Sequence, residues 1–256
     1  MKNILTIAGL LIKESFRKKD FYATLILSGM LLAYASRIEF YEVGSIYRYL
    51  LEIGLALAFG FTVVLTVILA ARQFPSEVQN RTLPVLLSKP VTRWEYVAGK
   101  FLGSVFGGLL SFAVFFAVVM FFALTKSHAL SFLVGVQTVY LFALVLLMVT
   151  AMASALSYVF TFGASALFTL LAYFGMLAYG PLLAVSAEKS GALRPVSMTV
   201  FNLLPHFEFF DLRARFIHGW PGLSPAALAF VTLYALCYTA FFLLLGWQLF
   251  RKKNLT

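Results

Sequence analysis

Long continuous apolar runs constrain the fold of this chain more than any other feature of its sequence. A short run lies at about 21–36, and longer ones follow at about 50–71, 101–124, 132–158, 163–186 and 225–249. About 20 apolar residues in a helix cross a bilayer core, whereas a membrane β-barrel shows short segments of alternating polarity. With 62% hydrophobic and 12% charged residues, a soluble fold could not cover its surface. The sequence therefore predicts an all-α polytopic membrane protein, with six transmembrane helices in a single domain over residues 1–256.

The segment before the first run predicts an interfacial helix over residues 1–20. Basic residues lie mostly away from its apolar positions, which are Ile4, Ile7, Ala8, Leu11 and Phe16. This pattern favours a helix that lies in the plane of the membrane surface. The opening also resembles a secretory signal peptide, because a basic start and an apolar core precede Ala33-Tyr34-Ala35. We favour a segment that is retained.

The distribution of charge predicts the orientation. With the N-terminus inside, the cytoplasmic segments are 1–20, 72–100, a tight turn near 159–162, and 250–256. Most of the 20 Lys and Arg residues then lie inside, namely Lys2, Lys13, Arg17, Lys18, Lys19, Arg72, Arg81, Lys89, Arg93, Lys100, Arg251, Lys252 and Lys253. The positive-inside rule favours this arrangement, with both termini cytoplasmic in a cell membrane, most simply a bacterial inner membrane. The formal net charge of +10 is then matched by anionic lipid headgroups and does not require nucleic acid.

No catalytic pattern stands out in the sequence. It has no glycine-rich phosphate loop, no His-Glu-x-x-His pair and no Gly-x-Ser-x-Gly elbow. The residues His206, Glu208, Asp211 and His218 do not converge on one helix face, so we expect no metal site. The single cysteine, Cys237, excludes an internal disulfide and is expected to be buried. We expect a non-catalytic chain that holds no cofactor itself.

The middles of the predicted spans lack ionisable residues. Ion-coupled carriers usually keep such a group at depth, because coupling occurs there. This pattern counts against a secondary transporter and leaves an ATP-independent channel or carrier as a less favoured alternative. The energy for any transport is expected to come from elsewhere.

Two polar segments, 72–100 inside and 187–224 outside, are longer than simple connectors. In the outer one, residues 202–218 predict an interfacial or re-entrant helix opened by Pro205, with Asp211 and Arg215 spaced for an ion pair. Its apolar stripe would comprise Phe207, Phe210, Ala214 and Ile217. This element either caps the outer mouth or contacts a substrate or an external partner.

The inner segment predicts a short helix between two prolines. Pro75 suits a helix start, Glu77 and Arg81 are spaced for an i,i+4 pair, and Pro90 ends the element. Its small apolar face consists of Leu83, Leu86 and Leu87. Such a helix is suited to binding in a groove of a partner protein. The alternative is that this segment is a solvated connector between two spans.

A further helix is expected to carry Arg93, Glu95 and Lys100 back into the membrane. Glycines recur every four residues at its start, at Gly99, Gly103 and Gly107. This spacing clears one face for close packing against another helix.

The inner segment resembles the signature of type-2 ATP-binding-cassette (ABC) permeases. The matching residues are Glu77, Arg81-Thr82, Leu86-Leu87-Ser88-Lys89-Pro90-Val91-Thr92-Arg93 and Gly99-Lys100. The opening Lys13-Glu14, Arg17-Lys18-Lys19 and Phe21-Tyr22, together with Leu204–Arg213, are similar to one branch of that family. That branch contains the permeases for nitrous-oxide-reductase maturation and multi-copper-protein maturation. The resemblance covers the whole chain.

The resemblance implies a cytoplasmic coupling helix docked on a separate ATPase subunit. The contact residues would be Glu77, Arg81, Thr82, Leu86 and Leu87, with Pro90, Val91 and Arg93 shaping the exit. Two permease copies, identical or different, would assemble with two ATPase subunits that bind ATP and Mg. This chain would be the permease of an exporter with an unidentified substrate. The Phe, Leu, Ala and Thr residues of the spans fit lipids, hydrophobic peptides or drugs, but core packing would give the same composition. The alternative is transmission of force to a periplasmic or external partner protein.

Overall fold

The structure is a computed structural model of the 256-residue chain that describes residues 6–10, 22, 26, 30, 46–81, 92–124, 131–186 and 205–252. The elements are α3 (Ile46–Gln79), α5 (Arg93–Leu124), α6 (Phe132–Ser157), α7 (Phe162–Ser186), the 3₁₀ helix η1 (Phe207–Phe210), α9 (Arg213–His218) and α10 (Pro225–Lys252). Within these ranges every regular element is a helix and no strand occurs. The predicted all-α class is confirmed for this part of the chain.

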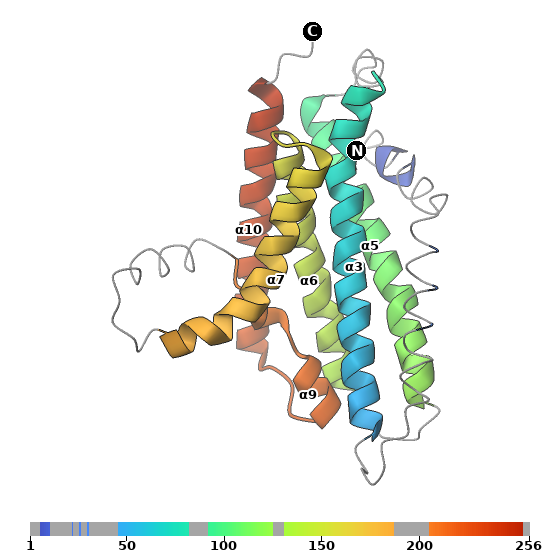
Figure 1. Ribbon diagram of the computed structural model, residues 1–256. Helices are drawn as coiled ribbons and strands as arrows, with labels where there is room; N and C mark the ends of the chain where they lie inside the picture. Colours follow the sequence, from blue (N-terminus) through green and yellow to red (C-terminus); the bar gives the residue numbers. More distant parts are fainter. Residues whose placement is uncertain are drawn as a thin grey trace.

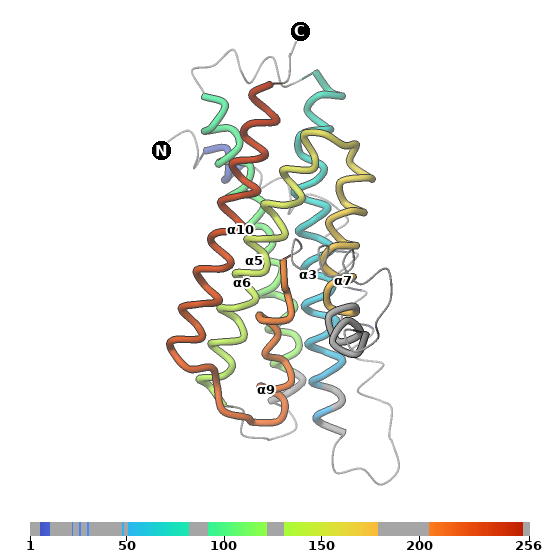
Figure 2. The backbone as a smooth tube through the Cα atoms, turned by 90° about the vertical axis from the view of Figure 1, so that its left-hand side faces the viewer, coloured from blue at the N-terminus to red at the C-terminus, as the bar shows by residue number. Residues whose placement is uncertain are grey.

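The long helices form an elongated bundle in which successive helices run in opposite directions (Figures 1 and 2). We name its two ends after the ends of α10. At the Lys252 end, α3 and α6 finish while α5 and α7 begin; at the Pro225 end, α3 and α6 begin and α9 lies beside them (Figure 1). Segments 82–91 and 158–161 therefore both connect helices at the Lys252 end.

Helix α6 is the central helix, since it packs against α3, α5, α7 and α10. Its second half is buried nearly all round, including the polar side chains of Thr150, Ser154 and Ser157. Each of these hydroxyls donates to a carbonyl of its own helix, three or four residues earlier. The buried hydroxyls are therefore satisfied without a partner from another helix.

Four helices are long and apolar enough to cross a membrane: Leu51–Gln79, Arg93–Phe121, Phe132–Ser157 and Pro225–Lys252, with Phe162–Ala178 as a shorter apolar helix. The chain is thus a multi-pass membrane protein, and the predicted turn near 159–162 is confirmed between α6 and α7. Apart from residues 6–10, 22, 26 and 30, the predicted interfacial helix 1–20 and first span 21–36 lie outside the described residues, as do 187–204 of the outer segment. The count of six spans stays a prediction.

Helix α3 continues through Pro75 to Gln79, so the prediction that Pro75 starts a new helix is wrong. Proline lacks a backbone N–H, which leaves the carbonyl of Ala71 without its helical donor. Membrane helices tolerate such a proline where neighbouring helices support the backbone. The resulting 34-residue helix is about 50 Å long at 1.5 Å per residue, well beyond a hydrocarbon core of about 30 Å. Its ends therefore extend out of the bilayer.

Helix α10 has the most exposed flank of the four candidate spans, with 17% of its apolar window buried. Large apolar side chains line this flank, including Phe230, Leu233, Leu236, Phe241 and Leu244. Cys237 is exposed there as well, so its expected burial is wrong. A membrane helix can expose an apolar flank of this kind because lipid tails cover it.

Candidate functional site

A buried charge pair joins α3 to α5 at the Lys252 end. The Glu77 carboxylate forms an ion pair with Lys100 and accepts a hydrogen bond from the Tyr96 hydroxyl at 2.5 Å. The side chains of Lys100 and Glu77 are only 11% and 14% exposed. One turn further along, the Gln73 amide donates to the Ser104 hydroxyl. Helices α3 and α5 are therefore joined by polar contacts at the Lys252 end of the bundle.

Aromatic rings pack α10 and the α6–α7 turn beside the Glu77–Lys100 pair. The fully buried ring of Phe250 on α10 stacks on Tyr96, with centroids 5.2 Å apart, and meets Phe74 edge-on at 5.7 Å. Tyr158, in the turn after α6, lies 5.4 Å from Phe250 and 4.9 Å from Phe74. We call Phe74, Glu77, Tyr96, Lys100, Tyr158 and Phe250 the helix junction. It connects α3, α5, α10 and the α6–α7 turn.

The start of α5 is also bonded to the end of α10. The Arg93 guanidinium donates to the carbonyls of Arg251 at 2.6 Å and Phe250 at 3.3 Å. A cation at this position satisfies the last carbonyls of α10 and opposes the negative end of its dipole. The predicted coupling residue Arg93 thus contacts α10.

A reciprocal capping box begins α5. The backbone N–H of Thr92 donates to the Glu95 carboxylate at 2.9 Å, and the N–H of Glu95 donates to the Thr92 hydroxyl at 3.2 Å. The sequence interpretation missed this cap, although Thr-x-x-Glu before an apolar run is its signature.

Only part of the predicted coupling helix can be placed. Glu77, Arg81 and Arg93 are described, whereas Thr82, Leu86, Leu87, Pro90 and Val91 lie outside the described residues. Arg81 is exposed beyond the end of α3, with a left-handed φ of 53°. The predicted i,i+4 pair of Glu77 with Arg81 is wrong, because Arg81 is not helical and Glu77 lies in the helix junction.

The predicted glycine face of α5 is buried at Gly99, Gly103 and Gly107. A close approach to α3 occurs at the next residue, Gly108. A Cβ atom there would lie 2.9 Å from Cγ2 of Thr66 and closer still to its hydroxyl oxygen. Thr66 has little room to turn away, because its hydroxyl donates to the carbonyl of Thr62 at 2.7 Å. Small size is therefore required at Gly108 for the contact between α3 and α5.

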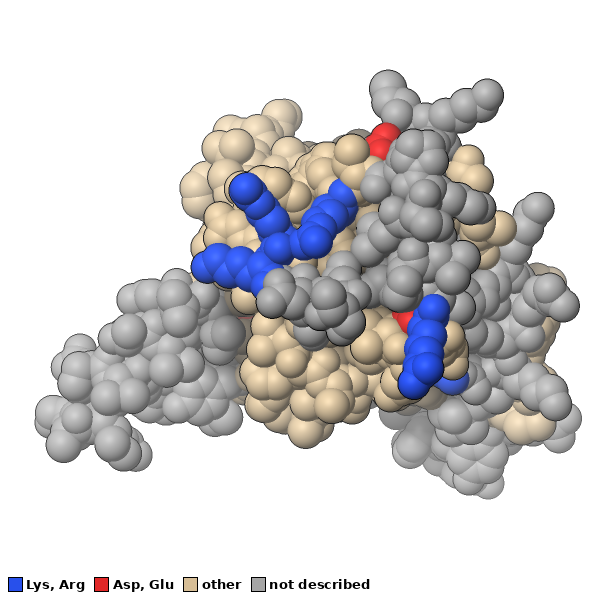
Figure 3. Space-filling view, turned by 90° about the horizontal axis from the view of Figure 1, so that it is seen from above, with Lys and Arg blue, Asp and Glu red and all other residues tan. Residues whose placement is uncertain are grey.

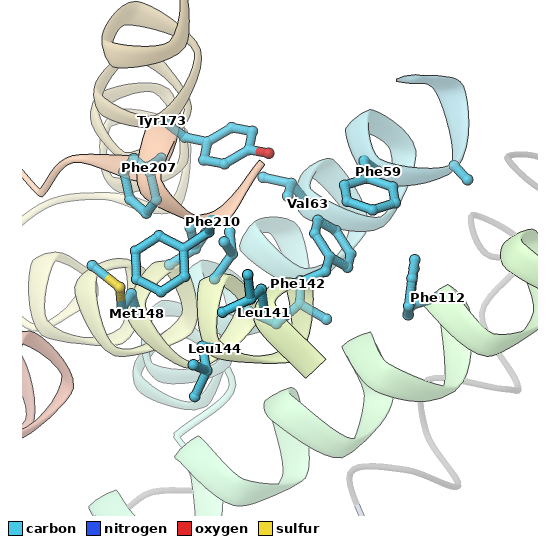
Figure 4. Close-up of a cluster of buried hydrophobic side chains, with 14 of the residues drawn as sticks. Phe59, Val63, Phe112, Leu141, Phe142, Leu144, Met148, Tyr173, Phe207 and Phe210 are labelled. Carbon is cyan, nitrogen blue, oxygen red and sulfur yellow. The ribbon is translucent and has the colours of Figure 1, made fainter. Parts of the chain in front are cut away.

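At the Pro225 end, residues 205–224 pack into the bundle, and we call them the inserted segment. Phe207 and Phe210 are buried beside Tyr173, Leu141 and Met148 in the main core (Figure 4). Pro205 is buried as well. Of the predicted apolar stripe, Phe207, Phe210 and Ile217 are buried in the bundle, whereas Ala214 is exposed.

The prediction of one continuous helix over 202–218 is wrong. The chain leaves the helical conformation at Asp211 and Leu212, between η1 and α9. The Asp211 carboxylate then binds Arg213, with contacts of 2.6 and 2.9 Å, and Arg215 donates to the carbonyl of Pro221 at 3.0 Å. The predicted Asp211–Arg215 pair does not form, since the helical spacing of four does not apply across the break.

The Asp211–Arg213 pair lies against the bundle. The Arg213 guanidinium is 5.6 Å from the ring centroid of Phe59 on α3, a cation–π distance. Burial alone would raise the pKa of Asp211, but the hydrogen bonds and charge of Arg213 outweigh it and hold that pKa below its usual value. The inserted segment thus brings a charged pair to a span whose own middle is apolar.

Two polar contacts hold the inserted segment to α6 and α10. The Gln137 amide accepts from the N–H of Leu223 at 2.9 Å and donates to the carbonyl of the same residue at 3.2 Å. The N–H of His206 donates to the Tyr234 hydroxyl at 2.9 Å. Apolar packing and these hydrogen bonds together fix the segment between α3, α6, α7 and α10.

Replacing Asp211 with Asn is expected to weaken the inserted segment mainly above pH 4. A carboxyl with a lowered pKa contributes stability above its unfolded pKa of about 3.9, and this contribution is lost as pH falls through the folded pKa. We expect a loss of about 1 kcal/mol at pH 7, because the side chain is still 30% exposed. Thermal unfolding in mild detergent at pH 7 and pH 3.5 measures it. An equal loss at both pH values would contradict an electrostatic role for Asp211.

The fold and the junction define a class: a multi-pass helical membrane protein whose long helices are joined at one end of the bundle. A family model described as ABC-2 family transporter protein matches residues 5–255, nearly the whole chain. The chain therefore belongs to the ABC-2 transporter family, as a membrane permease component of an ABC transporter. No individual curated protein matches it.

Proposed function

We propose that this chain is the permease of an ABC exporter and that segment 82–91 receives the movement of a separate ATPase subunit. The observation that carries the proposal is the helix junction. Both helices that flank this segment, α3 and α5, enter the junction through Glu77 and Lys100. A displacement of the segment would therefore reach α10 and the α6–α7 turn through Phe250 and Tyr158.

The lengths of the helices support this transmission. Helices α3 and α5 have 34 and 32 residues, so each is about 50 Å long and projects beyond the bilayer core. A force applied to the projecting ends would move α3 and α5 together, because the buried Glu77–Lys100 ion pair joins them. The chain itself would hydrolyse nothing; two ATPase subunits would bind ATP and Mg, and a second permease copy, identical or different, would complete the pathway.

The orientation follows from the same proposal. The Lys252 end would face the cytoplasm, because it carries Arg81, Arg93, Arg251 and Lys252 and the positive-inside rule favours this placement. Both chain termini would then be cytoplasmic, in a bacterial inner membrane. We also propose that the chain belongs to the copper-protein-maturation branch of the family. The support for this is the similarity of Leu204–Arg213 to that branch.

Reversing the charge of Arg81 is expected to weaken ATPase docking. Arg81 is exposed at the junction of α3 with segment 82–91, and a like-charge contact in an interface costs several kcal/mol. We expect Arg81→Glu to lower the affinity for the cognate ATPase subunit at least about ten-fold, with a matching loss of permease-stimulated ATP hydrolysis. The measurement uses the permease in nanodiscs. The matched control is Arg48→Glu, at the exposed opposite end of the same helix. Equal binding by both variants would remove the docking role of this segment.

A second function, transmission of force to an external partner, is favoured by the inserted segment. This segment is packed between α3, α6 and α7, so a movement of these helices would be transmitted to the surface at the Pro225 end. No substrate would need to cross the membrane. Nucleotide-dependent accessibility of a cysteine placed at Gly60 in a Cys237→Ser background distinguishes the two functions. Labelling that alternates with ATP favours a pathway beside α3, whereas protection in every nucleotide state favours transmission.

A further inference from the structure

Two tryptophans lie together at the Lys252 end, where α5 begins and α10 finishes. Trp94 and Trp247 meet edge-to-face with their ring centroids 6.3 Å apart, and Trp94 is 43% exposed. Tryptophan favours the headgroup level of a membrane, because its ring is apolar and its N–H needs a polar partner. The pair therefore indicates the level at which α5 and α10 leave the lipid.

Cations lie at the same end of the bundle as this tryptophan pair. The Arg251 guanidinium lies 5.7 Å from the ring centroid of Trp247, and both Arg251 and Lys252 are exposed. Figure 3 looks onto this end and shows blue side chains gathered over the end of α10. Arg93 is bonded to the last carbonyls of α10 and so reduces the negative potential at that helix end.

The acidic residues that the structure describes at this end are already engaged. Glu77 binds Lys100 and Tyr96 in the helix junction, and Glu95 binds Thr92 in the capping box. Within the described ranges no carboxylate therefore pairs with Arg251 or Lys252, and an anionic ligand meets no described acid at these two cations.

Apolar side chains continue from the tryptophans toward the middle of the membrane. Phe241, Leu244 and Leu245 are exposed on α10, within two turns of Trp247. A ligand that fits this surface needs a negatively charged head and a long apolar tail. An anionic phospholipid has both parts in the required order.

We propose that an anionic phospholipid binds between α5 and α10, with its phosphate on Arg251 and Lys252 and its upper chain on Trp94 and Trp247. The bound lipid would hold the start of α5 to the end of α10, beside the Arg93 contact. It would stabilise the helix junction from the membrane side. This inference depends on the membrane insertion of α5 and α10 and is independent of any ATPase.

The tryptophans themselves provide the measurement. The chain has three tryptophans, and Trp220 lies in the inserted segment at the opposite end, so Trp220→Phe leaves two reporters, both at the proposed site. The Trp220→Phe protein is reconstituted in phosphatidylcholine vesicles that contain increasing shares of phosphatidylglycerol with brominated acyl chains. Bromine quenches only those tryptophans that the lipid touches. We expect half-maximal quenching at a share at least about five-fold lower than with brominated phosphatidylcholine, since each basic residue near the surface contributes on the order of a five-fold preference.

The variants test the named cations. Lys252→Gln, which alters an exposed side chain, is expected to raise the half-quenching share about five-fold. Arg251→Gln/Lys252→Gln is expected to abolish the preference for the anionic lipid. Arg48→Gln, at the other end of the bundle, serves as the control and is expected to change nothing. Equal quenching by both lipids, or an unchanged preference in Lys252→Gln and in the double variant, would overturn the proposal. Relief of quenching by millimolar inorganic phosphate would also overturn it, because the site would then bind free phosphate.

Discussion

Replacing Glu77 with Gln is expected to destabilise the protein by about 3–5 kcal/mol, because it leaves the Lys100 ammonium buried without a counter-charge. The Lys100 side chain is only 11% exposed, so water cannot fully replace the carboxylate. The loss is measured from unfolding of the purified protein in mixed micelles with increasing denaturing detergent. The same variant is expected to lose the ion pair between α3 and α5, while the Gln73–Ser104 hydrogen bond remains.

A double-mutant cycle separates the ion pair from general disturbance. Glu77→Gln/Lys100→Met removes both charges, and we expect it to recover at least half of the loss caused by Glu77→Gln alone. Glu95→Gln is the matched control at the same end. Its carboxylate belongs to the capping box and is partly exposed, so its expected cost is about 0.5–1 kcal/mol. If the two single variants lost the same stability, the buried pair would not be the cause.

Enlarging Gly108 is expected to disrupt the packing of α3 on α5. An added Cβ at Gly108 would come within 2.9 Å of Cγ2 of Thr66 and nearer still to its hydroxyl oxygen. Overpacking of this kind costs about 1–3 kcal/mol for Gly108→Ala, and Gly108→Leu is expected to prevent assembly of the folded protein. The measurement is the yield of monodisperse protein in mild detergent, together with its unfolding transition.

Two further variants make this expectation specific. A Cβ at Gly60 would meet nothing within 4 Å, so Gly60→Ala is expected to be neutral or to stabilise α3 by up to about 1 kcal/mol. Thr66→Ala removes the hydroxyl and methyl group that face Gly108, and we expect it to rescue Gly108→Ala. Failure of this rescue would show that the clash lies elsewhere.

The spans were predictable because their signal is local. A run of about 20 apolar residues identifies a membrane helix without knowledge of its neighbours, and the bounds of α6, α7 and α10 follow the runs closely. Pro75 was wrongly predicted to start a helix because that prediction also used only a local signal. A proline is a local helix-breaking signal, whereas the support that carries α3 past it comes from helices distant in sequence.

The sites were predictable in their residues but not in their partners. Glu77 stood out in the sequence, yet its partner Lys100 lies on another helix and was assigned only to the return into the membrane. Asp211 was likewise paired by helical spacing with Arg215, whereas the break after η1 pairs it with Arg213. Such breaks are determined by burial of Phe207 and Phe210 in the core, which the local pattern does not contain.

The hydrogen bonds from Arg93 to the carbonyls of Phe250 and Arg251 affect how the protein can be handled and observed. They join the carboxyl-terminal end of α10 to the start of α5, the helix that follows segment 82–91. A rigid fusion placed directly after Lys252 would load the start of α5, so a purification tag there calls for a long flexible spacer. A small fluorescent or spin label at the same place would instead report movements of the start of α5.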